Sequence, residues 1–323
     1  MESIATSEQT TGPRRADGAA PKGLADQLRA AWNGEERGSV ALAAVCVGLL
    51  VLLYWPALVH LVWTWSRDEN YGHGFLVPLI SLYFANEVAQ RTKEAAQPKG
   101  WVCGIVLLAT AVLGRILTTM VPIGVIGDLS FVAGLAGILG LVAGTRTLKQ
   151  YRFPLFFLVF MIPLPIALYT LIATPLQRLV SLTASGILTL IGIPVLCQGN
   201  MMTLPGDIQL FVAEACSGMR QLTGFLALAT AVAWLLPRPA WYRVILIASS
   251  IPIALAANVL RVTLTAWVAY RFNPELASGW YHTVEGLLMM GVGLGMIAAE
   301  CALLDRVAMP GRGERVPVPH FAS

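Results

Sequence analysis

Charged residues are scarce in this sequence. Asp, Glu, Lys and Arg together make up 12% of the chain, whereas hydrophobic residues make up 56%. A soluble globular domain carries about 25% charged residues, so the composition excludes an ordinary soluble domain and indicates a polytopic membrane protein. The formal net charge of +4 is too small to indicate a nucleic-acid-binding surface, and no nucleic-acid partner is expected.

Cysteines are also few. The five cysteines are far apart, they form no CxxC pair, and the chain has no HExxH motif. A zinc site of the usual spacing is therefore excluded, and we expect neither a metal nor a cofactor. Cys46, Cys103 and Cys301 lie in apolar runs, as small buried hydrophobes do. Cys197 lies in a polar loop, and a disulfide with Cys216 is an alternative to a chemical role for that residue.

The N-terminal tail lacks an apolar core. Residues 1–38 are rich in Ala, Gly, Glu and Arg, a composition typical of disorder. The tail has no apolar stretch directly after Arg14-Arg15, and the first apolar run is too long for a signal-peptide core, so we expect no cleaved signal. We therefore predict a disordered cytoplasmic tail (1–38), a transmembrane domain (39–305) and a cytoplasmic C-terminal tail (306–323).

Apolar runs long enough to cross a bilayer recur along the chain. They lie at about 39–63, 72–89, 101–121, 125–144, 153–171, 217–236, 243–269 and 284–304. Pro163 and Pro165 should kink or end the fifth run. The expected fold class is therefore an all-α polytopic membrane protein with about eight transmembrane helices.

Lysines and arginines predict the orientation of these spans. They cluster in the N-terminal tail, in the loops after the second and fourth spans, around Pro237, and in the C-terminal tail. All of these clusters are cytoplasmic only if residues 174–196 do not cross, so we expect an amphipathic or re-entrant helix there, at the outer face. Both termini are then cytoplasmic. The turn signal Leu204-Pro205-Gly206-Asp207, within residues 197–213, predicts a small outer β-hairpin.

Three chemically distinctive residues reach the outer face on this topology. Cys216 begins one helix, Arg261 lies in the outer part of another, and His282 precedes the last span. A thiol at a helix N-terminus is acidified, an imidazole can take its proton, and a guanidinium can stabilise an oxyanion. We interpret the three as nucleophile, base and oxyanion stabiliser. The structural alternatives are a small buried residue for Cys216, a snorkelling cation for Arg261 and an interfacial residue for His282.

Residues around Cys216 are candidate supports. Ser217 and Gly218 offer backbone N–H groups to an oxyanion. Arg220, one turn after Cys216, either pairs with Glu214 or holds a substrate carboxylate.

Three further polar residues are candidates with structural alternatives. Asn258 lies one turn before Arg261 and is typical of a helix–helix hydrogen bond. Glu285, one turn after His282, either orients the imidazole or begins the helix as an acid favoured by its dipole. His73 is either a second base or part of a glycine-flanked transition from loop to helix.

These motifs resemble the exosortase/archaeosortase family. The resemblance covers residues 40–305 and rests on four segments: Glu214-Ala215-Cys216-Ser217-Gly218, Asn258-Val259-Leu260-Arg261, His282 with Glu285-Gly286, and Tyr71-Gly72-His73-Gly74-Phe75-Leu76-Val77-Pro78-Leu79. The archaeal branch tends to have Arg at the position of His282, so the bacterial branch fits better. The resemblance implies a cysteine endopeptidase or transpeptidase with Cys216 as nucleophile, Arg261 as transition-state stabiliser and His282 as acid/base.

The resemblance also implies substrates and a location. Exosortases are bacterial inner-membrane enzymes thought to cleave C-terminal PEP-CTERM sorting signals, which consist of a Pro-Glu-Pro-type motif, a transmembrane helix and a basic end. The implied partners are PEP-CTERM-tailed proteins, the lipid bilayer and an acceptor nucleophile of unknown identity, and the active site would face the periplasm. The alternatives are a non-catalytic scaffold and a transporter component of exopolysaccharide export. No repeat symmetry supports a transporter, and the lone Asp128 does not fit an aspartyl intramembrane protease.

Overall fold

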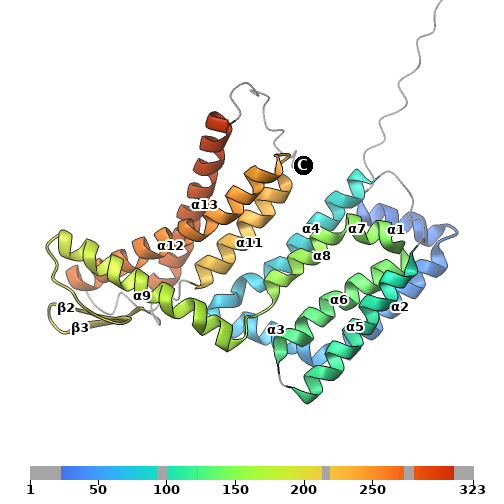
Figure 1. The fold of residues 1–323 in the computed structure, drawn as a ribbon, viewed down its shortest axis with the longest axis horizontal. Coiled ribbons are helices and arrows are strands. Elements are labelled where there is room, and N and C mark those ends of the chain that lie inside the picture. The colour runs from blue at the N-terminus through green and yellow to red at the C-terminus, as the bar shows by residue number, and fades with distance from the viewer. Residues whose placement is uncertain (1–22, 93–99, 122, 213–218, 273–279, 309–323) are drawn as a thin grey trace, which may run out of the picture.

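The computed structural model describes residues 23–92, 100–121, 123–212, 219–272 and 280–308, except for the side chains of Glu69 and residues 280–287. The elements, in chain order, are α1 (Leu24–Asn33), α2 (Arg37–Leu53), α3 (Trp55–Arg67), η1 (Glu69–Phe75), α4 (Leu76–Arg91), α5 (Trp101–Met120), α6 (Gly124–Val142), α7 (Gly144–Gln150), α8 (Arg152–Phe157), η2 (Leu158–Met161), α9 (Ile166–Leu190), β1 (Leu196–Gln198), β2 (Met201–Leu204), β3 (Ile208–Phe211), α11 (Met219–Leu235), α12 (Ala240–Arg271) and α13 (Trp280–Ala308). Figure 1 shows two groups of helices, α1–α8 and α9–α13, with the strands at the far end of the second group.

The fold is that of an all-α polytopic membrane protein with a small β-sheet, as the sequence predicts. Among the described residues, five helices are long and apolar enough to cross a membrane: α5, α6, α9, α12 and the Leu288–Val307 part of α13. A sixth results if α1 and α2, which meet at 119°, form one bent span. The expected number was about eight. The difference arises because two apolar runs are broken, and because α4 and α11 have only 16 and 17 residues.

The first apolar run breaks at Tyr54, between α2 and α3. Pro56 lies in the first turn of α3, where its missing N–H is harmless but prevents α2 from continuing. The Tyr54 hydroxyl donates to the Ala111 carbonyl at 2.7 Å and lies 2.8 Å from the Ser130 hydroxyl. The break is therefore fixed to α5 and α6.

The fifth run breaks where its prolines predict. Helical structure ends at Met161, and α9 begins only at Ile166, after Pro165. The prediction that Pro163 and Pro165 kink or end this span is confirmed. A proline lacks the N–H of a continuing helix and pushes the preceding residue out of the helical region.

Residues 174–196 differ from the expected surface helix. Most of them belong to α9, a continuous helix of 25 residues that starts earlier, at Ile166. Gln177 and Ser181 are buried against the protein, whereas Leu179 and Leu182 are exposed. This polarity is the reverse of that of an amphipathic helix facing water. It fits a helix whose apolar side faces lipid and whose polar side faces the protein.

The predicted hairpin is confirmed and gains a third strand. β2 and β3 are antiparallel, with Leu204 opposite Ile208, and β1 pairs with β2 on its other edge. Gly206 and Asp207 in the connecting turn have φ values of 84° and 56°. Glycine adopts such values at little cost and aspartate tolerates them, which explains why this turn can be read from the sequence.

The predicted disordered tail is too long. Residues 24–33 form α1, and the Leu24 N–H donates to the Asn86 side chain of α4 at 2.8 Å. Leu24, Leu28 and Trp32 recur every four residues, a helical spacing that carries the signal in the sequence. Residues 24–33 are therefore helical, contrary to the expectation of disorder up to residue 38.

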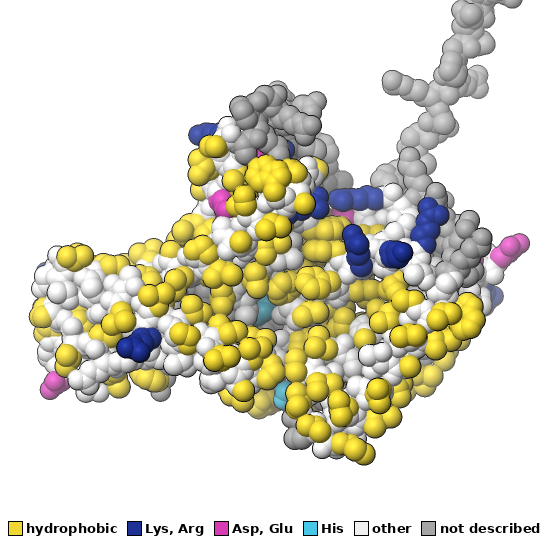
Figure 2. Space-filling view, in the orientation of Figure 1, with side chains coloured by type: hydrophobic (Ala, Val, Ile, Leu, Met, Phe, Trp, Pro, Cys, Tyr) yellow, Lys and Arg dark blue, Asp and Glu magenta, His cyan; other side chains and the backbone are white. Residues whose placement is uncertain are grey.

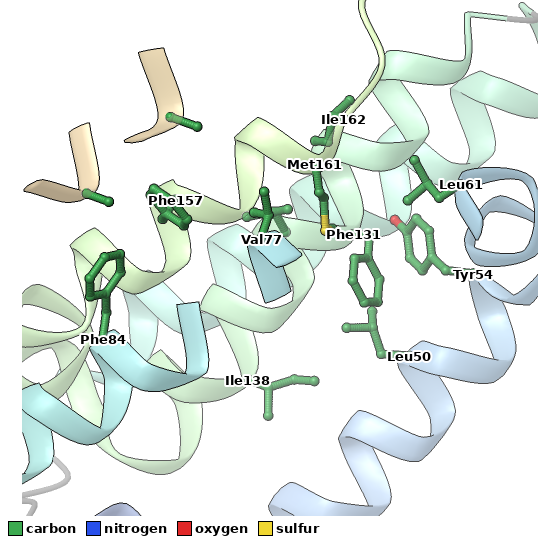
Figure 3. Packing of buried hydrophobic residues seen from close by; sticks show 13 residues of the cluster. Leu50, Tyr54, Leu61, Val77, Phe84, Phe131, Ile138, Phe157, Met161 and Ile162 are labelled. Carbon is green, nitrogen blue, oxygen red and sulfur yellow. The ribbon is translucent and has the colours of Figure 1, made fainter. Parts of the chain in front are cut away.

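Three hydrophobic cores hold the helices together. The first joins helices of the α2–α8 group and receives Ala227 and Ala231 of α11; Figure 3 shows Phe131 in this core beside Leu50 and Tyr54. The second core joins α11, α12 and α13, and the third packs α9 and the sheet against α12. Helices α11 and α12 are each shared between two cores, so residues on them are held from more than one side.

Trp234, near the end of α11, connects the two groups of helices. Its ring stacks on Phe153 of α8 with centroids 4.9 Å apart and lies 4.8 Å from the ring of Phe84 of α4. The Arg91 guanidinium covers the same indole at 5.1 Å. These contacts place the C-terminal ends of α4 and α11 together.

The basic ends of the helices lie on one side of the molecule. Arg238, after α11, pairs with Asp305 of α13 at 2.8 Å, and the Gln27 side chain of α1 donates to the Ala89 carbonyl of α4 at 2.7 Å. Figure 2 shows most of the visible Lys and Arg side chains in this part of the molecule, above a largely hydrophobic surface. The segregation of charge from apolar surface is what a bilayer requires.

Candidate functional site

Polar side chains line one buried face of α12. Asn258 and Arg261 are 2% and 3% exposed, and the Thr265 hydroxyl donates to the Arg261 carbonyl at 3.0 Å. Spacings of three and four residues place the three side chains on one face of the helix. Burying a guanidinium in an apolar helix costs several kcal/mol. Such a residue is a candidate functional residue.

Gln221, the third residue of α11, is a second buried polar group. Its side chain is 4% exposed, and neither its amide oxygen nor its amide nitrogen has a hydrogen-bond partner among the described residues. The same is true of the Asn258 amide oxygen. Buried amides are normally paired, and leaving one unpaired costs about 1–3 kcal/mol. Both amides therefore have unused capacity to bind another molecule.

Sequence analysis did not single out Gln221. Its signal was a polar side chain directly after Arg220 in an apolar helix. Arg220, the second residue of α11, is half-buried. The expected use of Asn258 in a helix–helix hydrogen bond is not seen for its oxygen atom, since the described residues offer this oxygen no donor.

Two contacts fix how α11 and α13 lie along each other. Arg238 pairs with Asp305, and the Phe225 ring lies where a side chain on Gly293 would project. The number of residues that separates Arg238 from Asp305 differs by only one from the number that separates Phe225 from Gly293. A step along α11 therefore corresponds to a step in the same direction along α13, so the two helices run parallel. On this register Arg220 is level with Leu288. The first turn of α13, which contains His282, then lies beyond the N-terminal end of α11, on the side away from Arg238.

The described residues cover only part of the predicted site. Glu214, Cys216, Ser217 and Gly218 lie outside them. His282 and Glu285 fall in the first two turns of α13, but their side chains are also outside the described part. The structure thus places Arg261, Asn258 and Arg220 on adjacent, packed helices, and it places the backbone of His282 on the third helix of the same core.

His73 lies in η1, an element that packs against α11. Because a carbonyl can only accept, the imidazole Nε2–H donates to the Phe160 carbonyl at 3.2 Å. Burial lowers the pKa of His73, while backbone hydrogen bonds with Phe160 and Asn70 act in the opposite direction. The imidazole is therefore neutral at pH 7 and binds the protein's own backbone.

Neighbours of His73 bind the same broken segment. The Trp65 indole donates to the Met161 carbonyl at 2.9 Å, and the Leu164 N–H donates to the Tyr71 hydroxyl at 3.1 Å. Backbone groups freed by a helix break within a membrane must find partners in the protein. These contacts give the Tyr71–Phe75 motif a structural role beside the site.

The sheet lies on the other side of α12 from α11. Cys197 in β1 is a free thiol that donates to the Gly199 carbonyl at 3.7 Å, and Cys216, its alternative disulfide partner, lies outside the described residues. The Asn200 side chain donates to the buried Gln177 oxygen of α9 at 2.9 Å. The hairpin is thereby held on α9. The described residues contain no group of three His, Cys, Asp or Glu side chains that would hold a metal ion.

The chemistry of this arrangement is that of anion stabilisation. Arg261 is a permanent cation in a low-dielectric setting, where its attraction for a developing negative charge far exceeds that in water. The unpaired amide atoms are one donor, the Gln221 nitrogen, and two acceptors, the Gln221 and Asn258 oxygens, on the packed helices α11 and α12. The guanidinium and the amide donor suit a developing oxyanion, whereas the two amide oxygens can only accept, as from the N–H groups of a peptide.

The fold and these buried polar residues define a class: a polytopic membrane protein with buried polar side chains on the packed helices α11 and α12. Comparison with protein families matches residues 65–299 to the family described as transmembrane exosortase (Exosortase_EpsH). The match covers most of the chain, so the protein belongs to the exosortase family. No curated protein and no solved structure matches the chain.

Proposed function

We propose that this exosortase-family membrane protein is a cysteine endopeptidase or transpeptidase that processes C-terminal sorting signals of exported proteins. The observation that carries the proposal is the burial of Arg261 on α12, a helix that packs against both α11 and α13. The cysteine of the family-like motif, Cys216, lies three residues before α11 in the sequence. The candidate base, His282, lies in the first turn of α13.

The proposed reaction proceeds through an acyl-enzyme. His282 takes the proton of the Cys216 thiol, and the thiolate attacks the scissile carbonyl carbon to form a C–S bond. Arg261 and the backbone N–H groups at Ser217 and Gly218 stabilise the oxyanion. The C–N bond then breaks, and His282 returns the proton to the leaving amine. Water or an acceptor nucleophile cleaves the thioester and restores the thiol.

The remaining candidates support this chemistry. We assign the Gln221 and Asn258 amides to the substrate's peptide backbone, because both are buried and have unused hydrogen-bonding capacity. Glu285 would orient His282, and Arg220 would pair with Glu214 or hold a substrate carboxylate. His73 would support the site through the packing of η1 on α11.

We further propose that the protein lies in the bacterial inner membrane with both termini in the cytoplasm and the site facing the periplasm. The gathering of the helix ends that carry Arg91, Arg238 and Asp305 at one side of the molecule supports this orientation. The beginnings of α11 and α13 lie at the opposite side (Figure 1). The substrate would be a PEP-CTERM-tailed protein whose single span docks from the bilayer.

Co-expression tests the proposal. The full chain is expressed with a tagged protein that ends in a PEP-CTERM-type tail, and tail loss is scored by gel shift. We expect the wild type to remove the tail and Cys216→Ala to leave it intact at equal membrane abundance. Cys197→Ala is the matched control, since Cys197 is a free thiol that lies in β1 and outside the family-like motif. Unchanged processing in Cys216→Ala would exclude the cysteine mechanism. An intact tail across a panel of tail motifs would favour the scaffold or transporter alternative.

A further inference from the structure

A groove of about 410 Å³ lies between α6 and α8, and none of the residues of the candidate site lines it. Leu129, Val132 and Ala136 of α6 form one wall, and Leu155 and Phe156 of α8 form the other. Its volume falls in the usual range for sites that hold small organic ligands. The walls are apolar, so the groove suits a hydrocarbon chain.

Two cations lie at one end of this groove. Lys149, in the last turn of α7, and Arg152, the first residue of α8, both line it and are exposed. The chain contains no Asp or Glu between Asp128 and Asp207. Among the described residues, neither Lys149 nor Arg152 has a carboxylate partner, so their charge is available to an external anion.

The ion pairs elsewhere in the protein show the contrast. Arg91 pairs with Glu87 at 3.2 Å, and Arg238 pairs with Asp305 at 2.8 Å. These arginines are neutralised within the chain. The α7–α8 junction lies in the region where Figure 2 shows Lys and Arg side chains above the hydrophobic surface. Such a change from apolar to basic side chains is what the boundary between membrane and water favours.

We propose that this groove binds an anionic phospholipid of the surrounding bilayer. The phosphate lies on Lys149 and Arg152, and one acyl chain lies between α6 and α8. Basic side chains at the mouth of an apolar groove between membrane helices match both parts of such a lipid, the charged headgroup and the hydrocarbon chain. The site is independent of the proposed peptidase chemistry.

The charge predicts the selectivity. A zwitterionic phospholipid has the same acyl chains but a neutral headgroup, so it gains the apolar contacts and loses the net attraction. Each basic side chain near a membrane surface contributes about 1 kcal/mol toward an anionic lipid, so two cations correspond to roughly a 30-fold preference.

Native mass spectrometry of the purified full chain tests this site. The protein in detergent is titrated with phosphatidylglycerol or with phosphatidylcholine of identical acyl chains. We expect about 30-fold tighter binding of phosphatidylglycerol, and loss of that preference in the double variant Lys149→Gln, Arg152→Gln. The matched control is Arg146→Gln, because Arg146 is an exposed cation on the same short helix but does not line the groove.

A second variant tests the apolar part. Ala136→Trp places a large side chain in the groove without altering charge, and it should weaken binding of both lipids while thermal melting confirms that the protein folds. Equal binding of the two lipids by the wild type would overturn the proposal. An equal loss of preference in Arg146→Gln and in the double variant would also overturn it, because general surface charge would then explain the effect.

Discussion

Arg238 and Asp305 form an ion pair of 2.8 Å that joins the C-terminal ends of α11 and α13. The Arg238 guanidinium also lies 5.9 Å from the centroid of the Tyr242 ring on α12. One cation therefore holds together the three helices that carry the candidate site. Because α11 and α13 are parallel, fixing their ends on one side also fixes the relative height of their N-termini on the other.

Breaking this pair should act at a distance. Asp305→Asn is expected to lower the stability of the protein by about 1 kcal/mol, because the pair is only partly shielded from water. The rate of tail removal should fall as well, since the height of the start of α13 relative to α11 is no longer fixed. Thermal unfolding followed by tryptophan fluorescence, together with the co-expression assay, measures both. The exchanged pair Arg238→Asp, Asp305→Arg should recover most of the loss. An Asp305→Asn variant with the stability and the processing rate of the wild type would contradict the role of the pair.

Arg261 should be required for rate rather than for membrane insertion. A lysine at this position keeps the charge but loses the planar fork of donors. We expect Arg261→Lys to slow tail removal by about 100-fold, the usual cost of removing one oxyanion donor, with less effect on melting temperature than Arg261→Ala. A lysine variant that processes substrate at the wild-type rate would assign Arg261 a structural role.

Gln221 offers a test that separates stability from activity. Replacing it with methionine keeps the shape and removes two buried polar atoms that lack partners among the described residues. The variant should be more stable by about 1 kcal/mol, because a buried unpaired amide is costly. Tail removal should nevertheless slow, because the variant lacks the side-chain amide that is proposed to bind the peptide backbone of the substrate. Thr223→Val on the same helix is the control, since its hydroxyl is already used by the Met219 carbonyl at 2.8 Å. A stabilised Gln221→Met variant with full activity would exclude the amide from substrate binding.

His73 should make stability depend on pH in the acid range. Its pKa in the folded protein lies below its usual value, chiefly because of burial, so the unfolded chain binds the proton more readily. The contribution of neutral His73 is then complete above the unfolded pKa, about 6.5, and decreases as the pH falls below it. Melting temperatures between pH 8 and pH 5 should decline for the wild type and decline less for His73→Asn. Identical pH profiles would contradict the buried, neutral imidazole.

Local features of the sequence predicted much of the fold. The helix break at Pro163 and Pro165 and the turn at Gly206-Asp207 depend on backbone chemistry that neighbouring residues determine, and both appear where expected. Long apolar runs likewise indicate membrane helices, because each span must satisfy its backbone hydrogen bonds within itself.

Interactions between distant segments were harder to predict. The polar residues of 174–196 indicated a water-facing surface, but Gln177 meets Asn200 from the sheet, and α9 turns its leucines outward. In a membrane protein an apolar side chain fits both lipid and core, so hydropathy alone does not tell which face of a helix is buried. Gln221 was missed for the same reason, since its burial depends on the packing of α11 against other helices.

The sequence by itself determined the membrane class, the positions of the breaks and turns, and the family-like motifs around Cys216, Arg261 and His282. These follow from local composition, backbone preference and residue identity. Only the tertiary structure decided that Arg261 and Asn258 are buried, that α11 and α13 are parallel, and that α1 is helical on the surface of α4. Those facts depend on which side chains meet across the fold, and packing between segments far apart in the chain sets them.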